Sequence, residues 1–471
     1  MISCILVLVI ASTLSAQVSF SGLDLSPTDE LLFVATTDAP GFGSYRTLLH
    51  AELQGVGEED SARAVAGGDV LRNASLSQLT FFPEIVTYLP SLRAVQIQNR
   101  FGLFRGSIDS GSFEPVVGFE SFSSGASVRT GRVFPVTASP DGRYLVALEP
   151  TSAAYGDLVL IATDGSGRTT VATRVELSTE QTPARWSPDS RFFVYSRGGS
   201  IFYFSVEQFE RGRLLGETFR ELGPGTLSSV RWSDQGSLYY VSGSLVYEIL
   251  GPEFFTRSLY AGLLQIGTII GKLPFLFDPN FDSFHIGPDG ETALLNKGGR
   301  NLFVLFLDPD DFVGEGEVRG LPSLFLPRNT RVRQVVWSAF GQVTILTGSI
   351  EQGASRSSVF RLNTQQTPRD LVFERMDERG VHEIRLSPDG ERIALLTGEG
   401  VAFHDHTTWA LERSVTVSEP VHAVWIDSER LVVGGRATVE IVSGPSGDRR
   451  VLTLAQPDEH SIGDDGTIVA R

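Results

Sequence analysis

A short motif recurs along this chain, and it restricts the fold more than any other feature of the sequence. Its clearest copies begin at Ser139, Trp186 and Ser387, and each places a Ser-Pro-Asp turn between two apolar runs. Proline presets φ for the first central position of a tight turn, and glycine supplies the left-handed conformation that folds the chain back as a hairpin. The repeat-turn residues are Pro140, Asp141, Gly142, Pro188, Asp189, Pro288, Asp289, Gly290, Pro388, Asp389 and Gly390. A chain that repeats such a unit builds one sheet after another.

The turns recur about every fifty residues, which is the spacing of propeller blades. Within each unit a glycine-rich turn, such as Gly198-Gly199 or Gly298-Gly299, separates the second apolar run from a third. The variable segment that follows leaves room for a fourth strand, and propeller blades have four. We therefore predict an all-β chain that forms a single closed β-propeller of four-stranded blades. We expect eight blades, with seven or nine as alternatives.

The copies resemble the WD40-like (PD40) propeller repeats of the TolB propeller domain and of prolyl-oligopeptidase-type enzymes. Residues 139–148, 186–204, 232–247, 287–305 and 387–405 carry the resemblance, and weaker copies extend it over nearly the whole chain. The resemblance implies a WD40-like (TolB-type) propeller over residues 17–471. It implies no single function, because such propellers serve unrelated roles. The Gly-His dipeptide of true WD40 repeats is absent from the sequence, and so is a Gly-x-Ser-x-Gly motif with room for a hydrolase domain.

The N-terminal residues 1–16 resemble a secretory signal peptide. Residues 4–14 are apolar or weakly polar, and the small residues Ser15 and Ala16 follow them. This run is too short for a membrane-spanning helix, and no later run is long enough, so we expect no transmembrane segment. We expect a periplasmic or secreted protein. Its mature form would have no disulfide, because Cys4 is the only cysteine.

The charge of the chain restricts its partners. The formal net charge is −17 and the pI is about 4.9, which argues against nucleic acid and anionic membrane surfaces. We expect a monomer that binds a protein or a component of the cell envelope, with its acidic surface favouring basic partners. The irregular segments 251–284 and 320–331 are the predicted contact surface. Its apolar anchors would be Leu276, Phe277, Leu324 and Phe325.

Three groups of residues were weighed as chemical sites. In His404-Asp405-His406, alternation along a strand would put both imidazoles on one face, as in metal sites, but no third ligand is visible nearby. The aspartate runs at 308–311 and 463–466 lack the ligand spacing of an EF-hand and are better explained as turns. Four tryptophans at equivalent repeat positions predict a core between blades and not an aromatic cage; they are Trp186, Trp232, Trp337 and Trp425. We assign no catalytic residue, no metal and no cofactor.

Two function classes remain open. The first, which we favour, is an exported, non-enzymatic β-propeller that serves as a binding scaffold in the cell envelope. The alternative is a propeller enzyme (a hydrolase, lactonase or lyase) with its site in the central channel, where three or more His, Asp, Glu or Arg side chains should then converge. A quinone-cofactor propeller is a weaker idea, because the sequence has no tryptophan-docking pattern.

Overall fold

The computed structural model describes most of the chain. The described residues are 17–25, 30–39, 43–53, 61–66, 85–89, 94–99, 102–107, 113–118, 136–152, 154–177, 182–233, 235–249, 268–307, 323–327, 329–349, 356–366, 372–376, 380–436, 438–454, 461–462 and 468–469. The predicted signal peptide at 1–16 and both aspartate runs lie wholly or mostly outside this set. So do residues 251–267, 320–322 and 328 of the predicted contact segments.

Successive groups of four strands each form one antiparallel sheet, hydrogen-bonded in sequence order. The first three sheets comprise β1 (Gln17–Leu25), β2 (Glu30–Ala39), β3 (Gly43–Glu52), β4 (Ser61–Ala66); β5 (Ile85–Leu89), β6 (Ala94–Asn99), β7 (Gly102–Ser107), β8 (Phe113–Gly118); and β9 (Val136–Ala138), β10 (Tyr144–Pro150), β11 (Tyr155–Ala162), β12 (Arg168–Glu176). The next three comprise β13 (Arg185–Trp186), β14 (Phe192–Arg197), β15 (Ser200–Ser205), β16 (Phe219–Pro224); β17 (Val230–Trp232), β18 (Leu238–Ser242), β19 (Leu245–Ile249), β20 (Thr268–Lys272); and β21 (Ser283–Ile286), β22 (Thr292–Lys297), β23 (Asn301–Phe306), β24 (Ser323–Phe325). The last three comprise β25 (Thr330–Trp337), β26 (Gln342–Ser349), β27 (Arg356–Asn363), β28 (Glu374–Met376); β29 (Glu383–Leu386), β30 (Arg392–Thr397), β31 (Gly400–Asp405), β32 (Leu411–Thr416); and β33 (His422–Trp425), β34 (Arg430–Gly434), β35 (Val439–Ser443), β36 (Arg449–Val451).

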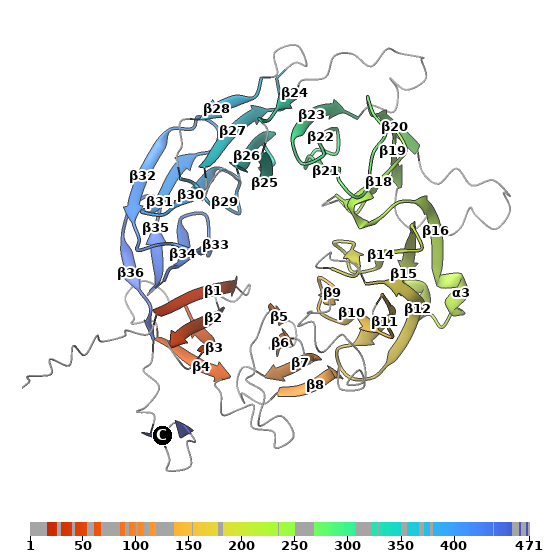
Figure 1. Cartoon of the computed structure of the whole chain (residues 1–471), viewed down its shortest axis with the longest axis horizontal. Helices are drawn as coiled ribbons and strands as arrows, with labels where there is room; N and C mark the ends of the chain where they lie inside the picture. The colour runs from red at the N-terminus through yellow and green to blue at the C-terminus, as the bar shows by residue number, and fades with distance from the viewer. Residues whose placement is uncertain are drawn as a thin grey trace, which may run out of the picture.

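The sheets follow one another around a ring, with strands such as β21, β29 and β33 nearest its centre (Figure 1). The described residues contain nine sheets of four or more strands. The helical elements among them are short: α2 (Val206–Glu210), α3 (Leu215–Thr218) and η3 (Leu227–Ser229) lie between β15 and β17. The predicted all-β architecture of repeated four-stranded antiparallel sheets is confirmed. No helix within the described ranges has both the length and the apolar character needed to cross a lipid bilayer.

The Ser-Pro-Asp turns join the first strand of a sheet to the second. The hydroxyl of Ser139 donates to Asp141 at 2.6 Å, and the carboxylate of Asp141 accepts the backbone N–H of Arg143 at 3.1 Å. The chain then reverses through a left-handed residue, with φ of 71° at Gly142 and 76° at Gly390. These positive φ values explain why glycine occupies this position. The predicted turn chemistry is confirmed at both glycines.

The apolar core lies between neighbouring sheets. One cluster combines Val146 and Leu158 of the third sheet with Phe193 and Phe204 of the fourth, and Trp186 packs against it. Trp232, Trp337 and Trp425 have the same relation to later pairs of sheets. The prediction that the tryptophans belong to the core between blades is confirmed.

Three of these tryptophans also bond to the preceding sheet. Each indole N–H donates to a backbone carbonyl on the first strand of that sheet. The distances are 3.4 Å from Trp186 to Thr137, 3.1 Å from Trp232 to Arg185 and 3.1 Å from Trp425 to Arg385. The first strands of neighbouring sheets are thus joined by a repeated polar contact as well as by apolar packing.

The first sheet packs against the last. Phe20 and Leu31 share a buried cluster with Val432 and Val439, and the backbone N–H of Phe20 donates to the carbonyl of Gly435 at 3.1 Å. The short strand β37 (Thr453–Leu454) pairs in parallel with β4 and is the fifth strand of the first sheet. A separate hairpin, β38 (Ser461–Ile462) and β39 (Ile468–Val469), follows.

Candidate functional site

The four predicted apolar anchors differ in exposure. Leu276 and Phe325 present their side chains to solvent, with exposed fractions of 74% and 65%. Phe277 is buried in the cluster between the fifth and sixth sheets, and Leu324 is half-buried against the cluster between the sixth and seventh. Of the four residues, Leu276 and Phe325 are therefore the ones that a partner could contact.

Phe275, the neighbour of Leu276, and Phe325 both contact Phe303 of the sixth sheet. Phe303 lies between the two segments, with its ring centroid 5.4 Å from that of Phe275 and 6.0 Å from that of Phe325. Phe303 and Phe325 lie on the same face of the β23–β24 pair at diagonal positions, because Asn301 is paired with Phe325 and Phe303 with Ser323. We call Phe275, Leu276, Phe303 and Phe325 the aromatic patch.

Backbone bonds hold the segment that carries Phe275 and Leu276. The N–H groups of Leu273 and Phe277 donate to the carbonyls of Ser244 and Gly243, at 2.7 and 2.8 Å, on the β18–β19 turn of the preceding sheet. Burial of Phe277 fixes the segment further, because its side chain packs between the two sheets. The exposed part of the patch is therefore held on a rigid base.

Of the two lysines of the chain, Lys297 contacts the patch and Lys272 is close to it in sequence. The ammonium of Lys297 is 4.2 Å from the ring centroid of Phe275 and donates to the carbonyl of Leu276 at 3.2 Å. Its charge is paired with the buried carboxylate of Asp282 at 3.3 Å. Lys272 is exposed three residues before Phe275. Lys297 therefore packs on the patch with its charge balanced by Asp282.

The histidines of the His404-Asp405-His406 motif make separate contacts, and that of His406 with Thr344 reaches the preceding sheet. Nε2 of His406 is 2.9 Å from the hydroxyl of Thr344, and Nδ1 is 3.4 Å from the carbonyl of Gly390. The ring of His404 packs on Trp409 with centroids 4.9 Å apart. Burial lowers the pKa of His406 to about 4, so its imidazole is neutral at neutral pH. Hydrogen bonding and packing of the two side chains therefore account for this motif.

Three ionisable side chains converge on the first strands of the last two sheets. Glu383 and Arg385 of β29 form an ion pair, and Nδ1 of His422 on β33 is 3.0 Å from the Glu383 carboxylate. Nη2 of Arg385 is 3.1 Å from the same ring nitrogen. All three are partly exposed. Sequence reasoning missed Glu383 and Arg385, although their alternate positions on one strand put them on the same face.

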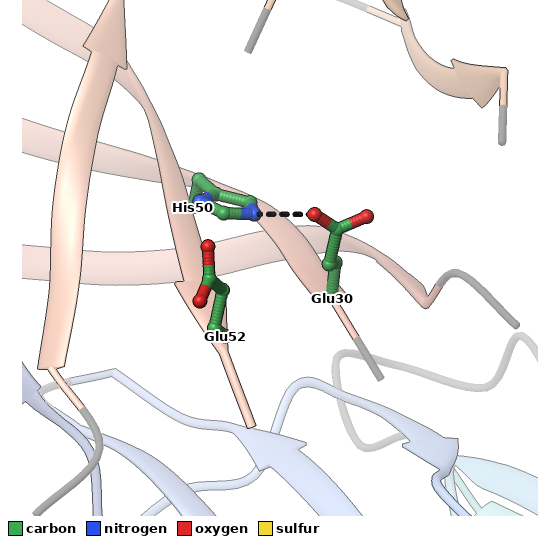
Figure 2. A group of neighbouring side chains, drawn as sticks. All are labelled: Glu30, His50 and Glu52. Atoms are coloured by element: carbon green, nitrogen blue, oxygen red, sulfur yellow. Dashed lines mark ion pairs between the residues drawn. The ribbon is translucent and has the colours of Figure 1, made fainter. Parts of the chain in front are cut away.

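A second cluster lies on the first sheet. Glu30 begins β2, and His50 and Glu52 lie near the end of β3 (Figure 2). Nε2 of His50 is 3.7 Å from the carboxylate of Glu30, and one donor atom from each of the three residues lies within 4.8 Å of the other two. His50 and Glu30 are 1% and 4% exposed, whereas Glu52 is exposed. The type and arrangement of these side chains suit a metal ion.

The sequence alone did not reveal the cluster on the first sheet. His50 lies inside the apolar run Leu48-Leu49-His50-Ala51, which resembles an ordinary core strand. Glu30 is twenty residues away, and only the pairing of β2 with β3 brings it next to the others. Predicting the cluster from the sequence would have required knowing the register of β2 with β3, which local sequence patterns do not define.

Comparison with known proteins supports the fold. No protein-family profile and no curated protein sequence matches the chain. A crystal structure of the eukaryotic initiation factor is similar with a TM-score of 0.50 and 11% identity, over 93% of this chain and 96% of that one. The chain is a β-propeller.

Weaker similarities extend to other solved structures. Sqt1 from Chaetomium thermophilum, bound to the N-terminus of the ribosomal protein L10, has a TM-score of 0.41 and 15% identity over 75% of this chain and 94% of that one. A prolyl endopeptidase has a TM-score of 0.39 and 12% identity over 96% of this chain and 53% of that one. At such identities a similarity concerns the fold alone, so function has to be argued from this chain's own residues.

Proposed function

We propose that this β-propeller is a non-enzymatic scaffold that binds a protein partner through the aromatic patch. The observation that carries the proposal is the contact of both Phe275 and Phe325 with Phe303, which brings together the two segments that carry the exposed anchors Leu276 and Phe325. Exposed apolar and aromatic side chains on a rigid base are typical of the energetic centre of a protein interface. The rigid base also reduces the entropy lost on binding.

The charges beside the patch favour a partner segment with both apolar and acidic side chains. Lys272 is exposed, and so is Arg331, the second residue of the first strand of the next sheet. The net charge of −17 would favour a basic partner if it acted as a whole. Salt screens exposed charges beyond about 8–10 Å, however, so the cations next to the contact dominate.

The experiment compares matched substitutions. Envelope proteins would be captured on the purified full chain, identified by mass spectrometry, and the partner then titrated directly against each variant. We expect Leu276→Asp and Phe325→Asp to weaken its binding at least tenfold, because each places a charge in an apolar contact. Leu214→Asp is the control, since Leu214 is equally exposed at 74% but lies far along the ring beside α3.

Equal binding by all three variants would remove the patch from the interface. A Lys272→Glu variant tests the charge argument separately. It should slow association with an acidic partner, and the difference from the unchanged protein should shrink as salt is raised.

Closure of the ring and the number of blades belong to the same proposal. We propose that each of the nine sheets is a blade and that packing of the first sheet on the last closes the ring. The contact of Phe20 with the last sheet and the pairing of β37 with β4 support closure. The turn geometry supports PD40-type repeats of the kind seen in TolB. Nine blades was an alternative to the eight that the sequence led us to expect.

Export is the remaining part of the proposal. We propose that residues 1–16 are a signal peptide and that the mature protein works in the periplasm or outside the cell. The start of β1 at Gln17, directly after the proposed cleavage point, supports this. N-terminal sequencing of the protein from the exported fraction should then begin at Gln17. Recovery of chains that still carry residues 1–16 would contradict it.

A catalytic role is the second candidate, favoured by the convergence of Glu383, Arg385 and His422 near the centre of the ring. In such an enzyme His422 would transfer a proton, Glu383 would orient its ring and Arg385 would bind an anionic group of the substrate. Assays with lactones, esters and glycosides would test this role. A His422→Asn variant should then lose activity about 10²–10⁴-fold. No turnover of any of the three classes would leave the scaffold as the function.

A further inference from the structure

We propose that Glu30, His50 and Glu52 bind one divalent transition-metal ion, with zinc as the best fit. The inference is independent of the proposed scaffold function, because the cluster is on the first sheet and the aromatic patch on the sixth. No catalysis is attributed to the ion. Its effect would be to fasten β2 to β3 at the end of the sheet where both carboxylates lie (Figure 2).

The strand register places two carboxylates directly opposite each other. Glu30 of β2 is paired with Glu52 of β3, and His50 lies two positions back on the same face, opposite Leu32. Like charges at directly opposed positions destabilise a sheet. Glu30 is only 4% exposed, so water does little to screen its charge. A metal ion bound to both carboxylates would offset this repulsion.

The distances suit a metal ion that lies between the side chains. The 3.7 Å from Nε2 of His50 to the Glu30 carboxylate is longer than a hydrogen bond. Two ligand atoms about 2.1 Å from a tetrahedral zinc ion are about 3.4 Å apart. Donor atoms that lie within 4.8 Å of one another therefore need only a small movement to surround such an ion.

The seventh sheet offers an internal comparison. Its strands β26 and β27 pair Gln342 with Asn363 and Thr344 with Arg361, which are the positions of Glu30 with Glu52 and Leu32 with His50. There the long side chain of Arg361 supplies the cation, and it donates to the amide oxygen of Gln342 at 3.4 Å.

The first sheet differs from the seventh at all four of these positions. Both amides are replaced by carboxylates, and the guanidinium is replaced by a shorter imidazole. The polar contacts of the seventh sheet satisfy a cation that belongs to the chain. The first sheet has at these positions residue types that bind a metal ion.

The mixed ligand set favours one class of ion. Magnesium and calcium prefer ligand shells made of oxygen, whereas an imidazole nitrogen suits zinc and its transition-metal neighbours. Two glutamates and a histidine fill three positions of a tetrahedral site. Because Glu52 is exposed, water can reach the fourth position.

A competing arrangement involves Arg63, which is paired with His50 on β4. If an arginine at this position balances the two carboxylates, no metal ion is needed. The two arrangements predict opposite effects of replacing Glu52 on the stability of the metal-free protein. Glu52 is exposed, so its substitution should leave the fold intact. If the site binds a metal ion, Glu52→Gln should stabilise the metal-free protein, because it removes the repulsion between the two carboxylates. It should also weaken metal binding, because it removes a ligand.

The experiment uses the full chain without an affinity tag, freed of metal with a chelator. Zinc is titrated by calorimetry against a competing chelator, and melting temperatures are measured with and without zinc. We expect one zinc per chain, at least tenfold weaker binding by Glu52→Gln, and a zinc-dependent rise in melting temperature that this variant loses. Glu399→Gln, an exposed carboxylate on the β30–β31 turn, is the matched control and should bind zinc like the unchanged protein.

Three results would overturn the proposal. One is the absence of saturable binding at one zinc per chain. Another is equal zinc affinity in Glu30→Gln, Glu52→Gln and the control. The third is a lower melting temperature of metal-free Glu52→Gln that Arg63→Gln reproduces, because an arginine and not a metal ion would then hold the carboxylates. Tighter binding of calcium than of zinc would reject the assigned class of ion.

Discussion

His406 is a buried imidazole whose protonation is linked to folding. Its side chain is fully buried between the seventh and eighth sheets, where it contacts Thr344 and Gly390. Burial is the main cause that lowers its pKa from 6.5 to about 4. Between these two values the unfolded chain binds a proton at this histidine and the folded chain does not. Stability should therefore fall as the pH decreases through this window.

We expect this one group to make the protein about 2 kcal/mol less stable at pH 5 than at pH 7. Denaturant unfolding at the two pH values would measure the loss, and a His406→Gln variant should show a correspondingly smaller one. The comparison with the variant separates His406 from carboxylates, which titrate mainly at lower pH. The same pH dependence in both proteins would contradict the assigned burial.

The hydrogen bonds from tryptophan side chains to the first strand of the preceding sheet can be tested by substitution. Replacing Trp425 by Phe keeps a ring in the core but removes the N–H that donates to Arg385. The carbonyl loses its partner, so we expect a loss of about 1 kcal/mol in the free energy of unfolding. Trp337→Phe is the internal control, because the buried indole N–H of Trp337 has no hydrogen-bond partner among the described residues. A loss at Trp337 as large as at Trp425 would show that ring size, and not the polar contact, joins the strands.

Elements that depend on local sequence could be predicted, and pairs that depend on register could not. The turn at Pro388-Asp389-Gly390 and the strands beside it follow from residues next to one another in the chain. So does the place of Trp186 in the core, because its position repeats. The approach of Glu30 to Glu52 requires knowing which residues of two strands face each other. The contact of Phe275 and Phe325 through Phe303 likewise depends on tertiary packing.

At the scale of the whole molecule, packing of the first sheet on the last should contribute strongly to stability. Phe20 is fully buried in the cluster that the two sheets share. We expect Phe20→Ala to cost about 3–5 kcal/mol, because it leaves a cavity at this junction. Phe281→Ala removes the same ring from a site that is 72% exposed, and should change stability little. Denaturant unfolding measures both, and near-equal effects would argue against a packed junction.

The repeated turns predicted the fold better than they predicted the number of blades. Regular turns from Pro140 to Pro388 were enough to predict a ring of similar sheets. The markers at Pro27 and Pro90 lack the Asp-Gly pair, because different residues follow each proline. With such weak copies, a count of turns leaves several numbers of blades open. The contact between the first and last sheets involves residues from opposite ends of the chain, so no local pattern could reveal it.

The pairing of β37 with β4 also affects how the chain is made. Ser61 pairs with Thr453, so the outer edge of the first sheet lacks its neighbour through most of translation. Contacts between residues so distant in sequence form slowly, and an uncovered strand edge is a template for pairing with other chains. Until Thr453 has been synthesised, we expect the β4 edge at Ser61 and Ala62 to be open to pairing with another strand.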